Sequence, residues 1–381
     1  MHILEIPSFF TPYGGEFCLE QAKALKALGH EVRILSNVQL GITIGGKDFL
    51  VFPSCRFEHE QEGITVYQSY QRGLPLMVHH NVKRWIKIVR AMFADYVNKY
   101  GHPDILHAHC AKWAGYAAML ISRDYDIPYV ITEHLPKMLL EKEFGKAPSS
   151  AWQIPLLKEA YENANMVIPV SEELVDDVAC YSGTDYRWQF ISNTIDTDFF
   201  HYQPRSSREG RRFCFCCVAD NVYRKGYDVL IPAFRMLKEQ GHDAELRIAG
   251  RKSDTKCFRA QLSEGMTSLG QLSKEQIRDL LYESDALVLA SRSEVQPLVL
   301  LEAMATGIPV IATTCIPQNL RIEGGCTIVP IDDVEALSAA MKQVMEKPFN
   351  DGLSISEQVK AMASPQAVGE KLESLFCSLL S

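Results

Sequence analysis

The 381-residue sequence lacks several patterns that would assign it to other classes of protein. It has no apolar stretch near the roughly 20 residues that a membrane span requires. Its N-terminus resembles a strand and has no signal-peptide pattern. Its eleven cysteines are an odd number, and Cys214, Cys216 and Cys217 lie in an apolar run, which favours reduced, buried thiols over a disulfide framework or a zinc site. We therefore expect a cytoplasmic protein, attached at most to the inner face of the membrane.

The sequence also lacks a basic excess and a standard phosphate loop. The net charge of −8 argues against a nucleic-acid partner, which would need a basic face. No G-x-G-x-x-G fingerprint follows the first predicted strand. Residues 41–48 nearly spell an NTPase phosphate loop, but Asp48 replaces the Ser or Thr that would hold magnesium, and residues 49–52 indicate a strand rather than a helix.

The chain has a strand–helix alternation that runs through it twice. Its length exceeds what one hydrophobic core usually serves, so two domains are expected. The predicted strands are 2–6, 31–35, 105–107, 129–131 and 166–169 in the first half, and 213–218, 245–249, 286–289, 309–312 and 327–329 in the second. Helices between strands predict an α/β fold of two doubly wound, Rossmann-like parallel-sheet domains, which we expect to face a central cleft.

The expected boundary lies in residues 194–212, which carry Pro204, Gly210 and a charge run without any clear period. We place the first domain at 1–195 and the second at 196–364. A C-terminal helix at about 365–381 is expected to pack back on the first domain.

The most informative segment holds Glu294 and Glu302 on either side of a predicted helix start. Pro297 is placed as the first helical residue, and Gly307 can end the helix after residues 298–305. The N–H groups of a helix start attract phosphate, carboxylates accept hydrogen bonds from hydroxyls, and open α/β sheets bind ligands at strand carboxyl ends. The segment can therefore bind a sugar diphosphate. The alternative is a pair of solvated surface glutamates.

Two further loops could contact phosphate. Gly14 and Gly15 precede the predicted helix 16–28 and would let backbone approach a ligand closely, although the Gly-Gly pair by itself favours a plain turn. Arg224 and Lys225 open the predicted helix 227–240 and could neutralise a diphosphate, or form a solvated charge pair.

Three histidines end predicted strands: His107, His109 and His134. They could orient a sugar or share a proton, or they could make structural hydrogen bonds. A metal site is conceivable, but only two of the three are close in sequence.

The predicted helix 81–100 has an apolar stripe that includes Trp85, which is typical of a helix that covers a sheet. Lys83, Arg84, Lys87 and Arg90 lie off that stripe and could alternatively contact anionic lipid.

Taken together, these segments resemble the family-4 retaining glycosyltransferases of the two-Rossmann-domain (GT-B) type over nearly the whole chain. The most specific part comprises residues 291–294 and 302–310. Residues 13–15, 107–109, 132–134 and 170–172 support it. Residues 191–196 resemble the family's interdomain segment, and residues 269–275 resemble its stretch beside the nucleotide base.

The resemblance implies roles for the candidate residues. Glu294 would hold hydroxyls of the donor sugar, Lys225 would stabilise the leaving diphosphate, and His134 would lie near the transferred sugar, so these three are the catalytic candidates. The donor-binding candidates are Gly14, Gly15, Arg224, Lys225, Leu298, Val299, Glu302 for the ribose, and Leu269. His109 and Tyr13 are candidates on the acceptor or sugar side.

The resemblance also implies the substrates and the reaction. The partners would be a nucleoside-diphosphate sugar as donor and a glycan or lipid-linked acceptor, used in cell-surface polysaccharide synthesis with the first domain on the acceptor side and the second on the donor side. The family binds no metal and needs no cofactor, and it retains the anomeric configuration by front-face attack.

The sequence departs from the family pattern in three places. Asp220 stands where the family often has a phosphate-binding Arg, which Arg224 could replace. The segments 294–297 and 314–317 also differ from the family's glycine-containing motifs. Two alternatives stay open. Sugar-nucleotide 2-epimerases share a similar two-domain layout, and the Arg missing at Asp220 would also fit a non-catalytic partner subunit that binds a nucleotide sugar.

Overall fold

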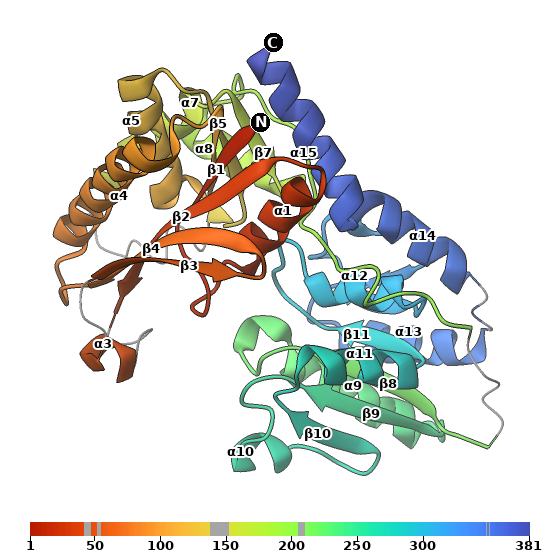
Figure 1. Ribbon diagram of the computed structural model, residues 1–381. Helices are drawn as coiled ribbons and strands as arrows, with labels where there is room; N and C mark the ends of the chain where they lie inside the picture. The colour runs from red at the N-terminus through yellow and green to blue at the C-terminus, as the bar shows by residue number, and fades with distance from the viewer. Residues whose placement is uncertain (42–46, 52–54, 138–151, 205–209, 348, 350) are drawn as a thin grey trace. The chain divides into compact units, whose positions relative to one another are not determined.

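The computed structural model describes residues 1–41, 47–51, 55–137, 152–204, 210–347, 349 and 351–381. They form two compact units: Met1–Thr194 with Pro365–Ser381, and Ile195–Ser364. Each unit is built around one sheet whose strands run parallel except for one edge strand of the first sheet, and helices cover the sheets (Figure 1). The predicted α/β class with two parallel-sheet domains is confirmed.

The first sheet has the strand order β3-β4-β2-β1-β5-β6-β7, in which only β3 is antiparallel to its neighbour. Its strands are β1 (His2–Pro7), β2 (Glu31–Leu40), β3 (Cys55–Gln61), β4 (Ile64–Arg72), β5 (Ile105–His109), β6 (Tyr129–Glu133) and β7 (Met166–Pro169). The helices of this unit are α1 (Glu16–Ala27), α3 (Lys47–Val51), α4 (Val78–Tyr100), η1 (Ala111–Gly115), α5 (Tyr116–Tyr125), α7 (Ile154–Glu162), α8 (Glu173–Ser182) and α15 (Pro365–Leu380).

The second sheet is parallel throughout, in the order β10-β9-β8-β11-β12-β13. Its strands are β8 (Phe213–Val218), β9 (Ala244–Ala249), β10 (Met266–Gly270), β11 (Ala286–Leu289), β12 (Val310–Thr313) and β13 (Cys326–Val329). The helices are η3 (Tyr223–Lys225), α9 (Tyr227–Glu239), α10 (Lys256–Arg259), α11 (Lys274–Glu283), α12 (Leu298–Ala305), η4 (Gln318–Leu320), α13 (Val334–Glu346) and α14 (Gly352–Ala363).

The central strands are apolar because both faces of each sheet are covered there. Leu4 packs into the cluster under α4 and α5, whereas its neighbour Ile3 packs into the cluster under α1 and α15. In β8, Phe215 and Cys217 face one cluster and Cys216 faces the other. Successive side chains of a strand point to opposite faces, so a strand buried on both sides needs an uninterrupted apolar run. The expectation of buried thiols is confirmed for this run.

The C-terminal helix α15 lies against α1 of the first unit (Figure 1). Val368, Leu372 and Phe376 belong to the same buried cluster as Leu19 of α1. The apolar side of α15 therefore completes the core on that face of the first sheet.

Three local expectations were wrong. Residues 47–51 form the short helix α3, where a strand was predicted from position 49 onward. The antiparallel hairpin of β3 and β4 and the edge strand β10 were not predicted. Pro297 caps α12 from the preceding position in an extended conformation instead of being its first residue. Most of the near-match to a phosphate loop, residues 42–46, lies outside the described residues.

Candidate functional site

Glu294 is the centre of a hydrogen-bonded group at the carboxyl end of β11. Its Oε1 accepts hydrogen bonds from Lys225 Nζ at 2.6 Å and from Ser291 Oγ at 2.6 Å, and its Oε2 lies 3.3 Å from Arg224 Nη1. The Glu294 side chain is only 5% exposed and that of Lys225 14%, whereas that of Arg224 is 47% exposed. The structure thus joins two of the three predicted catalytic residues in one buried ion pair.

The backbone brings these side chains together by linking the loops after β8 and β11. Arg292 N donates a hydrogen bond to Arg224 O at 2.7 Å. Gly226 has φ +67, and a Cβ there would lie 1.9 Å from Ala290 O. Only glycine lets the loop that carries Lys225 lie this close to the end of β11.

Two residues of this group were not predicted as site residues: Ser291 and Thr313. Thr313 ends β12, and its Oγ1 donates a hydrogen bond to Ser291 O at 2.5 Å, which fixes the residue whose hydroxyl holds Glu294. The signal was present in the sequence, because both residues immediately follow or end apolar strands, where ligand-facing polar side chains gather.

Glu302 lies in the second turn of α12, as predicted. It is half-buried, and among the described residues no group donates a hydrogen bond to its carboxylate. Burial raises its pKa to about 7, and Lys274 opposes that rise. The predicted donor-binding residues Leu298 and Val299 form the first turn of the same helix, where backbone N–H groups have no acceptor within the helix.

The raised pKa of Glu302 makes a testable prediction about stability. Below pH 4.5, the pKa of the unfolded state, the Glu302 carboxyl is protonated in both the folded and the unfolded protein. Between pH 4.5 and about 7 it is protonated only in the folded protein, so unfolding releases a proton. The free energy of unfolding therefore falls as the pH rises through this range. Glu302→Gln removes this penalty. Its free energy of unfolding should exceed that of the wild type by an amount that grows by about 2 kcal/mol from pH 5 to pH 8.

Urea denaturation at pH 5, 6, 7 and 8 measures this difference. Glu335→Gln, on an exposed position of α13, is the control and should give a small, flat difference. A pH-independent difference for Glu302→Gln would show that the carboxyl titrates normally.

The carboxylate of Asp220 forms an ion pair with Arg251, which lies in the neighbouring loop. Its Oδ2 accepts hydrogen bonds from Arg251 Nε at 2.9 Å and Nη2 at 2.6 Å, and its Oδ1 accepts one from Arg251 N at 3.0 Å. Burial of Asp220 acts to raise its pKa, but the bonds to Arg251 outweigh burial and lower it. A positive group therefore does lie at the carboxyl end of β8, although it comes from the loop after β9.

A cavity of about 300 Å³ lies beside this pair at the carboxyl ends of β8 and β9. Its lining includes Asp220, Arg251, Gln271 and Leu272. The predicted residue Leu269 lies in β10, is 37% exposed, and is not part of the lining.

In the first unit, the glycine loop has the predicted position before α1. Gly14 and Gly15 have φ +103 and +83, and a Cβ on Gly15 would lie 2.2 Å from Phe9 O. The Tyr13 hydroxyl donates a hydrogen bond to Asp48 Oδ2 at 2.5 Å, so this hydroxyl already has a protein partner.

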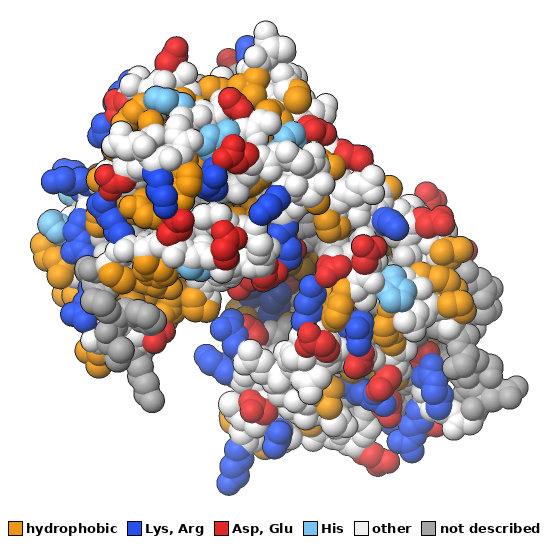
Figure 2. Space-filling view, viewed as in Figure 1, with side chains coloured by type: hydrophobic (Ala, Val, Ile, Leu, Met, Phe, Trp, Pro, Cys, Tyr) orange, Lys and Arg blue, Asp and Glu red, His pale blue; other side chains and the backbone are white. Residues whose placement is uncertain are grey.

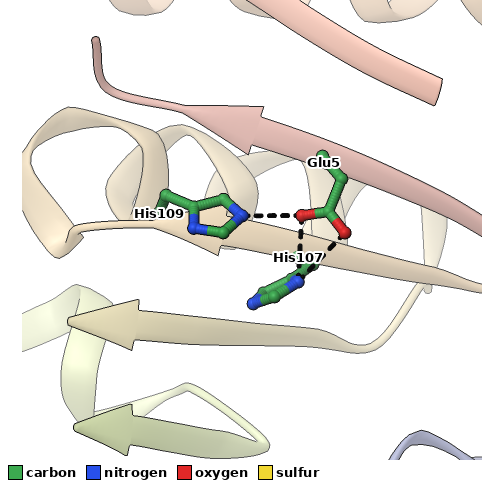
Figure 3. A group of neighbouring side chains, drawn as sticks. All are labelled: Glu5, His107 and His109. Carbon is green, nitrogen blue, oxygen red and sulfur yellow. Dashed lines mark hydrogen bonds and ion pairs between the residues drawn. The ribbon is translucent and has the colours of Figure 1, made fainter. Parts of the chain in front are cut away.

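The predicted histidines meet at a buried glutamate that was not predicted (Figure 3). Glu5 in β1 stands beside His107 of β5 in the strand register. Its Oε2 lies 2.9 Å from His107 Nδ1 and 2.7 Å from His109 Nε2. His109 Nδ1 in turn lies 3.2 Å from His134 Nε2. A glutamate inside an apolar strand is unusual, and this exception in the sequence could have identified Glu5 as a member of the histidine group.

Glu5, His107 and His109 could together offer three ligand atoms to a metal ion, because these atoms lie within 4.8 Å of one another. However, the same atoms already hydrogen-bond to one another, and His107 Nε2 also has Thr132 Oγ1 at 2.6 Å. The geometry of the group is fully accounted for by hydrogen bonds.

The basic residues of α4 divide into two groups. Lys83, Lys87 and Arg90 are exposed, and basic side chains gather over α4 in Figure 2. Arg84 instead donates hydrogen bonds to Gln71 Oε1 at 2.8 Å and to Arg72 O at 2.5 Å. Trp85 is buried and its Nε1 donates a hydrogen bond to Asn37 O, so the expectation that the apolar stripe of this helix covers the sheet is confirmed at this residue.

No helix in the described ranges is long and apolar enough to span a membrane.

Each of the two units is matched by a model of a glycosyltransferase family. A family model described as Glycosyltransferase Family 4 matches residues 14–199. A second model, described as Glycosyl transferases group 1, matches residues 210–347. The two matches together cover the first sheet from α1 onward and the whole of the second sheet.

Two similar curated proteins each align with more than four-fifths of the chain. The chain is 27% identical over 328 residues (81% of this chain, 78% of the relative) to the Bacillus subtilis (strain 168) protein named "Putative teichuronic acid biosynthesis glycosyltransferase TuaC". It is 25% identical over 344 residues (85% of this chain, 80% of the relative) to glycogen synthase of Mycobacterium tuberculosis (strain CDC 1551 / Oshkosh).

Solved structures share the fold at low identity. Sucrose-phosphate synthase from Thermosynechococcus elongatus aligns with a TM-score of 0.76 and 19% identity, over 100% of this chain and 99% of that one. Anabaena Alr3699/HepE in complex with UDP aligns with a TM-score of 0.74 and 17% identity, over 99% and 100%.

Proposed function

The chain belongs to the family-4 glycosyltransferases, and on that premise we propose that it transfers a sugar from a nucleoside-diphosphate sugar to a glycan or lipid-linked acceptor, with retention of anomeric configuration. The observation that carries the proposal is the Glu294–Lys225 pair at the end of β11, next to the start of α12. An enzyme that breaks a sugar–phosphate bond needs acceptors for hydroxyls and donors for the leaving diphosphate, and this group supplies both.

Each part of the donor has a candidate partner in the second unit. Lys225 and the first N–H groups of α12 suit the diphosphate, Glu294 the sugar hydroxyls, and Glu302 the ribose hydroxyls. The cavity beside Arg251 suits the base and the adjoining phosphate. Alr3699/HepE, which shares the fold, was solved with UDP and with UDP-glucose, which supports a nucleotide-sugar donor here.

We infer that Arg251 takes over the task of the arginine that the family often has at position 220. Asp220 holds the Arg251 guanidinium through two of its N–H groups and leaves it 69% exposed, so its remaining N–H groups are available to a phosphate. The argument for a non-catalytic partner subunit was the arginine missing at position 220, and Arg251 weakens that argument.

A thermal-shift screen over uridine, guanosine and adenosine diphosphates tests donor binding. One of them should raise the melting temperature, because a ligand that binds only the folded state stabilises it. Arg251→Ala should weaken that ligand's binding about tenfold or more, the value of one charge-assisted contact. Arg235→Ala, on the exposed side of α9, is the matched control. If no nucleoside diphosphate shifts the melting temperature, the donor assignment is wrong.

Product analysis separates transfer from the alternative of 2-epimerisation. Incubation with the nucleotide sugar alone should leave the sugar unchanged apart from slow hydrolysis, and transfer should require an acceptor. A changed sugar without acceptor would favour the epimerase instead.

We propose that the acceptor is an intermediate in the synthesis of a cell-surface glycan. The support is the name of the B. subtilis relative, which refers to teichuronic acid biosynthesis. The first unit would serve the acceptor and the transferred sugar, through His134 and the loop of Tyr13 and Gly14. His109 is buried and both its ring nitrogens are engaged, by Glu5 and by His134, so it would act only through His134.

Contact with an anionic membrane surface is a further part of the proposal, carried by α4. Leu76, Met77 and Val78 at its start are exposed, and Lys83 and Lys87 follow on the exposed side. Apolar side chains beside lysines are the composition of an interfacial helix end. Such a contact would bring the enzyme to a lipid-linked acceptor.

Co-sedimentation with anionic vesicles at low salt tests this contact. A basic residue near the surface contributes about 1 kcal/mol, so Lys83→Ala/Lys87→Ala should lower the partition coefficient about 30-fold. Lys342→Ala/Lys360→Ala in the second unit is the control pair. Equal binding by both double variants, or none by the wild type, would remove the proposal.

A further inference from the structure

We propose that a buried chain of hydrogen bonds from Glu5 through His109 sets the tautomer of His134, so that His134 offers an unprotonated Nδ1 as acceptor to a carbohydrate hydroxyl. Glu5 and His109 then act as positioning residues. This inference rests on the proposed function for the nature of the ligand, but the tautomer itself follows from the hydrogen-bond geometry.

The chain begins at Glu5, whose side chain is fully buried. Burial opposes its ionisation, but the electrostatic effect of His107 and the hydrogen bonds from both imidazoles outweigh burial and lower the pKa of Glu5 to about 2. An ionised carboxylate can only accept hydrogen bonds. His107 Nδ1 and His109 Nε2, which both contact it, must therefore carry protons.

The second link is His109. Burial and the neighbouring His107 lower its pKa to about 4 against the effect of Glu5, so the ring is neutral near pH 7 and holds a single proton. That proton is on Nε2, toward Glu5. Its Nδ1 is therefore a lone pair, and the contact of 3.2 Å with His134 Nε2 is a hydrogen bond only if His134 is the donor.

The third link is His134. Burial, with His109 and His107 adding to it, lowers its pKa well below the usual value, so this ring is neutral as well. Its single proton is on Nε2, which leaves Nδ1 as a lone pair. His134 is 9% exposed, and its Nδ1 is a buried nitrogen for which the described residues provide no hydrogen-bond partner. A buried acceptor left unmatched is costly, and a ligand hydroxyl would satisfy it.

The surroundings hold the His134 ring in place. Phe17 of α1 stacks on it with 3.6 Å between ring centroids. Its backbone N donates to Glu133 Oε1 at 2.9 Å, and Glu133 Oε2 accepts hydrogen bonds from Ala111 N and Tyr161 Oη. Glu133 therefore ties the loop after β6 to the loop after β5 and fixes the backbone of His134, while the stacking on Phe17 and the contact with His109 hold the ring itself.

The polarity of Nδ1 decides what it can bind. A lone pair accepts a hydrogen bond from a hydroxyl and is repelled by phosphate or carbonyl oxygens. A metal ion on Glu5 and His109 Nε2 would reverse this polarity, because a ring that binds metal through Nε2 carries its proton on Nδ1. His109 would then donate to His134 Nε2, and His134 Nδ1 would become a donor.

Nitrogen-15 NMR of the wild-type protein labelled at its eleven histidines reads these tautomers directly. The His134 signals are assigned by their absence from His134→Phe. We expect His134 with an unprotonated Nδ1 and a protonated Nε2, and His109 in the same form, in protein that carries no metal by elemental analysis. A protonated His134 Nδ1, or a stoichiometric metal ion, would overturn the inference.

His109→Phe supplies a second readout, since it keeps an aromatic ring beside His134 but removes the acceptor for its Nε2–H. His134 should then populate both tautomers in the NMR spectrum. Transfer should fall about tenfold or more, while the affinity for the nucleoside diphosphate stays within about twofold of wild type. An unchanged His134 tautomer in His109→Phe would also overturn the inference. Failure of the proposed function would look different: the wild type itself would bind no nucleoside diphosphate.

Discussion

Lys225→Ala is expected to lower the kcat of sugar transfer about 10²–10³-fold, the usual cost of removing one preorganised group that stabilises developing charge. Negative charge grows on the diphosphate as the sugar–phosphate bond breaks, so a cation beside it acts more strongly on the transition state than on the bound donor. The KM for the donor should therefore change much less than kcat.

The structure explains why this lysine should matter more than its neighbour. The Lys225 side chain is 14% exposed and lies 2.6 Å from Glu294, whereas Arg224 is 47% exposed and lies 3.3 Å from the same carboxylate. A charge that is shielded from water interacts more strongly with a nearby phosphate. Arg224→Ala should accordingly cost about tenfold or less in kcat.

Steady-state kinetics with the donor identified by the binding screen measure these effects. Lys238→Ala, near the end of α9, is the matched control, because its ion pair with Asp243 lies away from the site. If Lys225→Ala keeps kcat within about threefold of wild type while it folds normally, the assignment of this group as the catalytic site fails.

The sequence allowed the central strands and their ligand-bearing ends to be predicted. Apolar runs such as Phe213–Val218 and Ala286–Leu289 are long enough to be strands and are buried on both faces, so composition alone identifies them. Edge strands are different. Cys55–Gln61 carries three charged residues in seven and is antiparallel, and it is held by pairing with β4 and by the ion pairs Arg56–Asp95 and Glu58–Lys99 to α4.

The candidate site shows the same division between local and long-range information. A loop glutamate after a strand and a lysine at a helix start are local patterns, and both were predicted. The Asp220–Arg251 pair joins residues from loops after two neighbouring strands, so the sequence suggested only that an arginine was missing. Glu5 was overlooked for a similar reason, since its partners come from β5, about a hundred residues along the chain.

Gly226→Ala should be strongly destabilising. A Cβ at this position would lie 1.9 Å from Ala290 O and 2.8 Å from Ala290 C, both backbone atoms at the end of β11. No side-chain movement relieves such an overlap, so the loops after β8 and β11 must separate. We expect a loss of about 3–5 kcal/mol in the free energy of unfolding.

Gly241→Ala, at the other end of the same helix, isolates the cause. Gly226 and Gly241 have φ of +67 and +86, so both variants carry the cost of a side chain in the left-handed region, about 1–2 kcal/mol. Nothing lies within 4 Å of a Cβ at Gly241. The excess loss in Gly226→Ala over Gly241→Ala, measured by urea denaturation, therefore reports the steric overlap alone, and equal losses would contradict the close approach.

Function should fail in Gly226→Ala even where the protein is still folded. Separation of the two loops breaks the hydrogen bond from Arg292 N to Arg224 O and moves Lys225 away from Glu294. At a temperature where circular dichroism shows both glycine variants folded, Gly226→Ala should lose kcat to about the extent of Lys225→Ala, while Gly241→Ala keeps it. A folded Gly226→Ala protein with normal turnover would mean that the contact between these loops does not position the lysine, and that the site must be assembled in some other way.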